Sequence, residues 1–269
     1  MSRLQGKVAI VTGGAQGLGR AICERLAFEG CVVAVADLNG QGAEETAAAI
    51  AAATGARVVG AKVDVTREAE VEALFVGAER EFGRVDVVVS NAGVLIAEPI
   101  AEADAEKWRA VMTVNLFGYF LVTKHACRAM IKQRSGSIIQ INSKSGKKGS
   151  AANSAYAASK FGGVGHTQSV ALEMAKHNVR CNAICPGNLL DSPLWTDADK
   201  GLFAQYLRAG KVPGANDVAD GRAAYVAQVP MKRGCSYDDV CNAVTVLASD
   251  ASSYITGIAL SVTGGQEMN

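Results

Sequence analysis

The sequence predicts an α/β fold built on one doubly wound parallel sheet. Short β-branched runs alternate with longer amphipathic stretches along the chain, and the runs at 85–89 and 137–141 are largely apolar at successive positions. A strand covered by helices on both faces needs apolar residues on both faces, whereas a strand with one solvated face alternates. No linker, composition shift or repeat interrupts this alternation, so residues 1–269 are predicted to form a single domain.

The elements follow in order along the chain. The apolar run Val8–Thr12 predicts the first strand, the amphipathic pattern at 17–29 the first helix, and Cys31–Ala36 the second strand, which together make a βαβ unit. The same alternation predicts further helices near 41–53, 67–82, 105–132, 154–177 and 237–248, with strands near 57–63, 85–90 and 137–141.

The segment 188–229 breaks this rhythm. Pro193, Pro213 and Pro230 lie in it or at its end, and its helical periodicity is weak outside 203–208. A long excursion inside a compact domain is typically a lid or a binding loop. We therefore expect a substrate lid inserted in the single domain.

Composition excludes several classes of function. The 27 basic and 26 acidic residues leave a net charge of +1, so no overall field attracts nucleic acid or an anionic membrane. No leader precedes the first strand and no apolar run approaches the ~20 residues that span a bilayer, which indicates a cytoplasmic protein. A small-molecule substrate is the remaining expectation.

The cysteines and histidines do not indicate a metal site. The seven cysteines include no Cys-x-x-Cys pair and form an odd set, which argues against zinc and against a disulfide framework. His125, His166 and His177 are isolated from acids and cysteines at ligand spacing. We expect no metal.

A glycine-rich turn follows the first strand. Gly13, Gly17 and Gly19 stand in the pattern G-x-x-x-G-x-G, with Gln16 and Leu18 between them, directly before a helix. Glycine lets the backbone turn tightly and approach a pyrophosphate, and the free N–H groups of a helix start stabilise its charge. Three glycines can also form an ordinary turn, but their place between strand and helix favours dinucleotide binding.

The second strand ends at Asp37, eighteen residues beyond Gly19, where a carboxylate would bind the adenosine ribose hydroxyls. A carboxylate repels a 2′-phosphate, and no lysine or arginine stands at Gln16, Leu38 or Asn39. The expected cofactor is therefore NAD rather than NADP. A solvated Asp at a strand end is the competing interpretation.

Ser143, Tyr156 and Lys160 form a second constellation. The serine follows a strand, and the tyrosine and lysine lie at i and i+4 on the next helix, so they share a face. A cation at ~4 Å from a phenolate supplies about 4 kcal/mol at an effective dielectric of ~20, which would lower the pKa of the phenol and make Tyr156 a usable base. Taken alone, such a pair is usually a surface pair.

Together these residues resemble the short-chain dehydrogenase/reductase superfamily over essentially the whole chain. The resemblance rests on these marks: Thr12–Gly19, Asp64-Val65, Asn91-Ala92-Gly93, Asn115, Ser143, Tyr156 with Lys160, Pro186-Gly187 and Ile255-Thr256-Gly257. It implies a sheet of seven parallel strands, a homotetramer, and hydride transfer between an alcohol or ketone and a nicotinamide.

The resemblance also implies roles. Tyr156 would take the alcohol proton, Ser143 would bond the substrate oxygen, and Lys160 would lower the pKa of Tyr156 and hold the nicotinamide ribose, while Asn115 would anchor a relay water. The adenine of the cofactor would contact Asp64 and Val65, and its adenosine ribose would contact Asn91, Ala92 and Gly93. The carboxamide would contact the chain after Pro186, including Asn188 and Leu189. Asp191 stands where the family pattern has threonine, with Ser192 one place late.

Four blocks of the C-terminal half, at 141–147, 160–165, 187–190 and 229–235, resemble the sorbitol-6-phosphate 2-dehydrogenase branch. That branch implies a hexitol 6-phosphate oxidised to a 2-keto sugar phosphate. The cations that could bind a phosphate are Lys144, Lys147, Lys148 and Lys232-Arg233, and the competing interpretation is that these loop lysines are simply solvated. Ser145, Asn153 and Asn188 could bind hydroxyls of either a phosphorylated or a free polyol such as sorbitol or galactitol. The sequence also leaves open a dinucleotide-binding regulator without turnover and an acyl-chain ketone reductase, which would use NADP.

Overall fold

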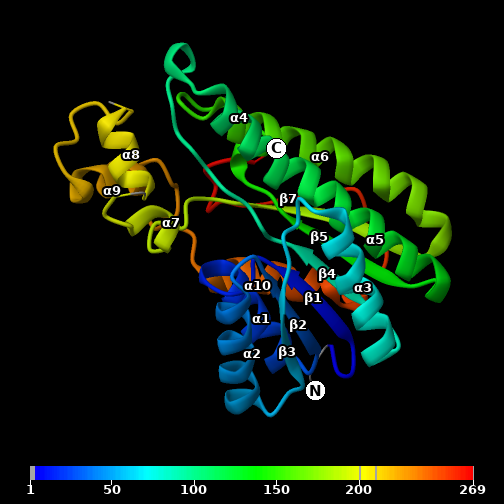
Figure 1. Cartoon of the computed structure of the whole chain (residues 1–269). Coiled ribbons are helices and arrows are strands. Elements are labelled where there is room, and N and C mark those ends of the chain that lie inside the picture. The colour runs from blue at the N-terminus through cyan, green and yellow to red at the C-terminus, as the bar shows by residue number, and fades with distance from the viewer. Residues whose placement is uncertain (1–3, 200, 210, 269) are drawn as a thin grey trace.

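The computed structural model describes residues 4–199, 201–209 and 211–268, and contains a parallel sheet of seven strands (Figure 1). The strands lie in the order β3-β2-β1-β4-β5-β6-β7. Their bounds are β1 Val8–Thr12, β2 Val32–Asp37, β3 Val58–Lys62, β4 Val87–Ser90, β5 Gly136–Ile141, β6 Val179–Pro186 and β7 Ala259–Val262. The predicted fold class is thereby confirmed.

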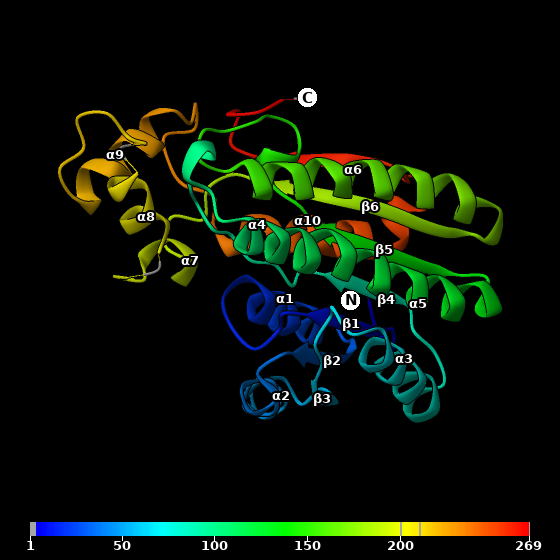
Figure 2. The ribbon, with the colours of Figure 1, turned by 45° about the horizontal axis from the view of Figure 1, so that its top comes forward.

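Helices cover both faces of the sheet (Figures 1 and 2). One apolar core joins the sheet to α1, α2 and α10, and a second joins its other face to α3, α5 and α6. Neighbouring residues of β1 illustrate this, since Val11 belongs to the first core and Ile10 to the second. The helices are α1 Gly17–Phe28, α2 Gly40–Thr54, α3 Glu68–Phe82, α4 Ala105–Met112, α5 Gly118–Gln133, α6 Ser154–Met174, α7 Pro193–Thr196, α8 Leu202–Arg208, α9 Val218–Ala227 and α10 Tyr237–Ala248.

A turn of π-helix interrupts the helix predicted at 105–132. It spans Thr113–Phe117, between α4 and α5. Such turns widen the backbone by one residue and are frequent at functional sites. Asn115 lies in this turn and is 2% exposed. Because the apolar spacing hardly changes across one inserted residue, the sequence pattern did not reveal it.

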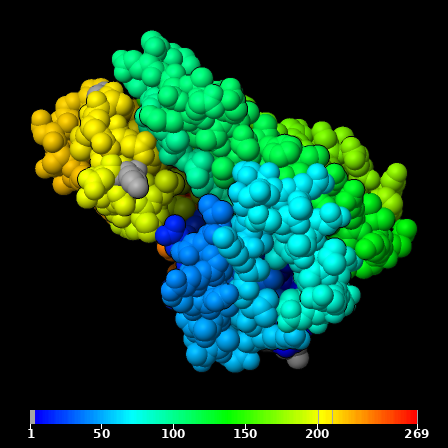
Figure 3. All heavy atoms as spheres, viewed as in Figure 1, coloured from blue at the N-terminus to red at the C-terminus, as the bar shows by residue number. Residues whose placement is uncertain are grey.

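Segment 188–229, the predicted lid, contains α7, α8 and α9 and forms a lobe beside the body of the molecule (Figure 3). It has a small core of its own, in which Trp195 contacts Phe203 and Tyr225 edge to face at centroid distances of 5.0 and 4.9 Å. The weak periodicity at 203–208 corresponds to α8. The sequence analysis missed α7, which has only four residues, and α9.

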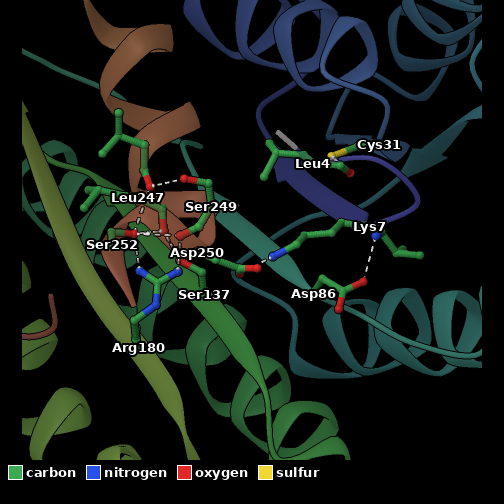
Figure 4. Close-up of polar contacts among 12 residues, drawn as sticks. Leu4, Lys7, Cys31, Asp86, Ser137, Arg180, Leu247, Ser249, Asp250 and Ser252 are labelled. Carbon is green, nitrogen blue, oxygen red and sulfur yellow. Dashed lines mark hydrogen bonds and ion pairs between the residues drawn. The ribbon is translucent and has the colours of Figure 1, made fainter. Parts of the chain in front are cut away.

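A polar network ties the far ends of the strands to the end of α10 (Figure 4). Arg180 of β6 donates to the Ser252 hydroxyl at 2.7 Å, Ser137 of β5 donates to the Leu247 carbonyl at 2.8 Å, and Lys7 pairs with Asp250 at 2.9 Å. These contacts fix the strand ends opposite the glycine turn. Among the described residues, no helix is both long and apolar enough to cross a bilayer.

Candidate active site

One cleft of about 1380 Å³ opens at the carboxyl ends of the strands, below the lid. Parallel sheets bind ligands at this edge, next to the point where the strand order reverses, which here lies between β1 and β4. The cleft is lined by all the cofactor residues predicted from the sequence: Gly13, Gln16, Gly17, Leu18, Gly19, Asp37, Leu38, Asp64, Val65, Asn91, Ala92, Gly93, Tyr156, Lys160, Pro186, Asn188 and Leu189. Ser143, Lys144, Ser145 and Asn153 line it too.

The glycine turn is held tightly between β1 and α1. A Cβ on Gly19 would lie 1.9 Å from the Gly13 carbonyl oxygen, and Gly13 itself has φ +65°. Asn91 donates from its amide nitrogen to that same carbonyl at 2.9 Å. The turn therefore requires glycine at both positions, and Asn91 fixes its shape from the end of β4. This cradle fits an anionic group that approaches the backbone closely.

Asp37 faces the same turn from the end of β2. Its carboxylate accepts hydrogen bonds from the Ala15 N–H at 3.0 Å and from the Asn39 N–H at 2.9 Å. The described lysines that line the cleft are Lys144, Lys148, Lys160 and Lys211, and none of them comes from the neighbourhood of Asp37 in β2 or the glycine turn. The charged side chains that line this end of the cleft are thus carboxylates, while Lys62 of β3 stands in register with Asp37 outside the lining.

Asp64 and Val65 line the cleft beyond β3. The carboxylate of Asp64 accepts from the Thr66 N–H at 2.9 Å and from the Thr66 hydroxyl at 2.7 Å, which lowers its pKa. Val65 is 8% exposed and packs against Gly118, where a Cβ would lie 2.9 Å from the valine side chain. Asp64 is therefore a fixed, ionised group at this wall.

Ser143, Tyr156 and Lys160 meet on the β5 and α6 side of the cleft. Ser143 follows β5 and its hydroxyl accepts from the Ser145 N–H at 3.1 Å. The Lys160 ammonium lies 5.4 Å from the centre of the Tyr156 ring, so the two side chains share the face of α6 that the i, i+4 spacing predicts. Lys160 is 5% exposed and donates to the Ile141 carbonyl at 2.9 Å.

The pKa values of this pair depart from the sequence expectation. Burial raises the pKa of Tyr156 to about 12, and its hydrogen bond with Ser143 acts in the opposite direction without prevailing. Burial also lowers the pKa of Lys160 to about 8. Desolvation disfavours the charged form of both groups, and the ammonium bonds a backbone carbonyl instead of the phenol. Tyr156 is therefore a neutral phenol at pH 7.

Asn115 lies behind the cleft wall. Its amide oxygen accepts from the Val94 N–H at 2.8 Å, and its nitrogen donates to the Val94 carbonyl at 2.8 Å and to the Ser159 hydroxyl at 3.1 Å. The amide thus joins the chain after β4 to α6. A Cβ on Gly93 would lie 3.3 Å from the Asn115 oxygen and 3.8 Å from the Lys160 nitrogen, so this glycine leaves the space between them open.

Two buried polar atoms at the base of the lid have no partner among the described residues. They are the amide nitrogen of Asn188 and the hydroxyl of Ser192, which are 8% and 5% exposed as residues and line the cleft. An unpaired buried polar atom costs about 1–3 kcal/mol, which a polar ligand group would offset. Asp191 instead points outward, 82% exposed, and pairs with Arg222 at 2.8 Å.

The predicted phosphate cations divide into two groups. Lys144 and Lys148 line the cleft, and Lys144 donates to the Gln266 amide oxygen at 3.0 Å. The other three do not line it: Lys147 donates to Ser261, Lys232 to the Ala227 carbonyl, and Arg233 pairs with Asp239. These three side chains therefore do not contribute to the cleft lining, since each has a partner outside it.

Lys211 and Tyr206 of the lid were missed by the sequence analysis. Both line the cleft, and the Lys211 ammonium lies 3.8 Å from the centre of the Tyr206 ring. Asn153, expected to bind substrate hydroxyls, is 3% exposed and bonds the Tyr206 hydroxyl at 2.8 Å. A lysine in a loop carries no local pattern that distinguishes it from a solvated one, so only the tertiary contact identifies Lys211.

The histidines lie away from the cleft lining. His125 is 3% exposed and bonds Glu68 at 3.3 Å, and His166 packs edge to face on Tyr119. In the described part of the chain, no three His, Cys, Asp or Glu side chains are grouped so that they could hold a metal ion. All seven cysteines are free thiols.

Comparisons with known proteins agree with this geometry. A family model for short chain dehydrogenases matches residues 7–201. Sorbitol-6-phosphate 2-dehydrogenase of Escherichia coli (strain K12) is 43% identical over 264 residues, covering 97% of this chain and 99% of that protein. The crystal structure of sorbitol-6-phosphate 2-dehydrogenase from Erwinia amylovora has a TM-score of 0.91 at 45% identity, covering 97% and 100% of the two chains. That of an NAD⁺-bound xylitol dehydrogenase has a TM-score of 0.90 at 31% identity, covering 98% and 100%. The chain therefore belongs to the short-chain dehydrogenase family, and is an oxidoreductase that acts on an alcohol with a nicotinamide dinucleotide.

Proposed function

We propose that the protein is an NAD-dependent dehydrogenase that interconverts sorbitol 6-phosphate and fructose 6-phosphate. The observation that carries this proposal is the position of Lys144, which directly follows Ser143 and lines the same cleft as Tyr156. A sugar phosphate needs a cation for its phosphate in the same cleft as the group that reacts at the alcohol carbon. The identity to sorbitol-6-phosphate 2-dehydrogenases over nearly the full chain supports the same substrate.

The reaction removes a hydride and a proton from the secondary alcohol. A bound nicotinamide supplies the two-electron hydride acceptor. In its ionised form, Tyr156 would take the hydroxyl proton as the C–O double bond forms, and Ser143 would donate a hydrogen bond to the same oxygen. Lys160 would hold positive charge beside the phenol and bind the nicotinamide ribose, while Asn115 would anchor the water that carries the proton outward. In the reverse direction the neutral phenol of Tyr156 donates its proton to the ketone oxygen.

The cofactor in this proposal is NAD. Asp37 would accept hydrogen bonds from the adenosine ribose and repel a 2′-phosphate, and the negative end of the cleft supports this assignment. Asp64 and Val65 would contact the adenine, and Asn91, Ala92 and Gly93 the adenosine ribose. The unpaired amide nitrogen of Asn188, next to Leu189, suits the carboxamide of the nicotinamide.

Steady-state kinetics test the proposal. We expect sorbitol 6-phosphate to exceed free sorbitol and galactitol in kcat/KM, with NAD preferred to NADP. The assignment fails if a free hexitol matches or exceeds the phosphate ester. The second candidate is a dehydrogenase of a free polyol, favoured by the neutral side chains of Ser145 and Asn188 in the cleft and by the similarity to a xylitol dehydrogenase.

We also propose a homotetramer. Phe161 and Leu172 of α6 are 46% and 82% exposed and stand eleven residues apart, which is about three helical turns, so they lie on one face. Phe117 and Phe120 near the start of α5 are 47% and 40% exposed. Apolar faces of this kind favour association of copies. Analytical ultracentrifugation of the wild-type chain should give the mass of four subunits, and a monomer would contradict the proposal.

A further inference from the structure

The lid and the body of the molecule meet at a lysine. Lys211 follows α8, and its ammonium donates to the Ser150 hydroxyl of the loop between β5 and α6 at 2.9 Å, across 61 residues of sequence. With its amide oxygen turned toward the lid, Asn153 accepts from the Tyr206 hydroxyl and from Lys211, both at 2.8 Å. This orientation gives every donor an acceptor, which is how the two ends of an amide are distinguished. The Lys211 ammonium, which belongs to the lid, thus contacts residues of the body.

Lys144 lines the same cleft as Lys211, from the body of the molecule. It lies in the turn after β5, and repulsion from it is a smaller cause that lowers the pKa of Lys211. Burial is the larger cause and lowers the pKa of each lysine to about 8. Both cations are partly buried in one cleft, where desolvation disfavours the charged form of each.

Carboxylates compensate these two lysines only in part. No described Asp or Glu forms an ion pair with Lys144 or Lys211. Glu267 acts on Lys144 from a distance and also lies 4.0 Å from Lys148. The partners of Lys144 and Lys211 are neutral: the Gln266 amide, the Ser150 hydroxyl, the Asn153 amide and the Tyr206 ring. A dianion between the two lysines would supply the missing negative charge.

We propose that Lys144 and Lys211 together bind the phosphate of the substrate. This assignment rests on the proposed function and adds a specificity-determining residue, Lys211, from the lid. Because one cation belongs to the body and the other to the lid, a phosphate bound by both would hold the lid against the body. A free polyol cannot make this bridge.

The test compares Lys211→Met with Lys147→Met. Lys147 lies three residues from Lys144 but bonds Ser261 outside the cleft, so it is a matched control. For wild type and both variants we would measure kcat/KM on sorbitol 6-phosphate and on free sorbitol. Lys211→Met should lower the ratio of kcat/KM on sorbitol 6-phosphate to kcat/KM on free sorbitol by about 10- to 100-fold, mainly through a higher KM for the phosphate ester. This is the range for a lost hydrogen bond to a charged group. Lys147→Met should keep the ratio within about twofold, as a surface change does.

A ratio in Lys211→Met equal to that of the wild type would overturn the assignment of Lys211, and the proposed function would stand. A wild-type preference for free sorbitol would overturn the proposed function itself, so the two failures are distinguishable. Inorganic phosphate provides a measurement that needs no variant. It should inhibit the wild-type enzyme competitively against sorbitol 6-phosphate, and an absence of inhibition at millimolar phosphate would contradict a phosphate site.

Discussion

Replacing Lys160 by methionine should stabilise the protein while abolishing its activity. Burial lowers the pKa of this lysine from 10.5 to about 8, so keeping it charged in the fold at pH 7 costs about 3 kcal/mol. Methionine removes this cost and fills similar space, but it loses the hydrogen bond to the Ile141 carbonyl, worth about 1 kcal/mol. We therefore expect a gain of about 1–2 kcal/mol in the free energy of unfolding.

The pH dependence of the stability gain distinguishes the desolvation of Lys160 from other causes of that gain. Between pH 8 and 10.5 the unfolded chain keeps the Lys160 proton and the folded chain loses it, so this group raises the wild-type free energy of unfolding with pH. The advantage of Lys160→Met should therefore shrink between pH 7 and pH 10. Urea unfolding at one protein concentration measures it, with the exposed Lys176→Met as control. A variant less stable than wild type at pH 7, or an advantage independent of pH, would refute the reasoning.

Further predictions concern the reaction and its cofactor. Tyr156→Phe should lower kcat by about 10²- to 10⁴-fold, while nucleotide binding, measured by fluorescence titration, should stay nearly unchanged. Full turnover by this variant would exclude Tyr156 as the acid and base. Because the pKa of Tyr156 is raised to about 12, alcohol oxidation should accelerate with rising pH while ketone reduction does not, and a pH-independent oxidation rate would contradict this. Asp37→Asn keeps an acceptor oxygen but removes the charge, so the preference for NAD over NADP, measured by cofactor titration, should fall at least about tenfold. EDTA should leave activity unchanged, and its loss would point to a metal requirement.

The sheet and the glycine turn could be predicted because their determinants are local. Apolar residues at successive positions, as in Val87–Ser90, indicate a strand covered on both faces, and the close contact of Gly19 with the Gly13 carbonyl explains the glycine spacing. The i, i+4 spacing likewise predicted that Tyr156 and Lys160 share a face. Spacing does not report desolvation, however, and desolvation decides the direction in which both pKa values move.

What could not be predicted depends on contacts between distant segments. The helix α9, with the sequence VADGRAAYVA, has alanine and glycine at many positions and no apolar stripe, so only its packing in the lid core makes it recognisable. Lys147 and Lys211 are both loop lysines, yet one bonds Ser261 and the other crosses to Ser150 in the cleft. Their different surroundings are set by the fold.

The same physical condition links three lysines of the cleft, of which Lys160 is buried and Lys144 and Lys211 are partly buried. Lys144, Lys160 and Lys211 each have a pKa lowered to about 8, mainly by burial. A fold selected only for stability would replace such cations by apolar side chains, since burying a charge without a counter-ion is unfavourable. Their retention in one cavity, beside the unpaired polar atoms of Asn188 and Ser192, is explained if anionic and polar ligand groups complete the interactions. Stability and ligand binding are therefore opposed at these positions. Methionine at any of them should raise the free energy of unfolding and weaken ligand binding.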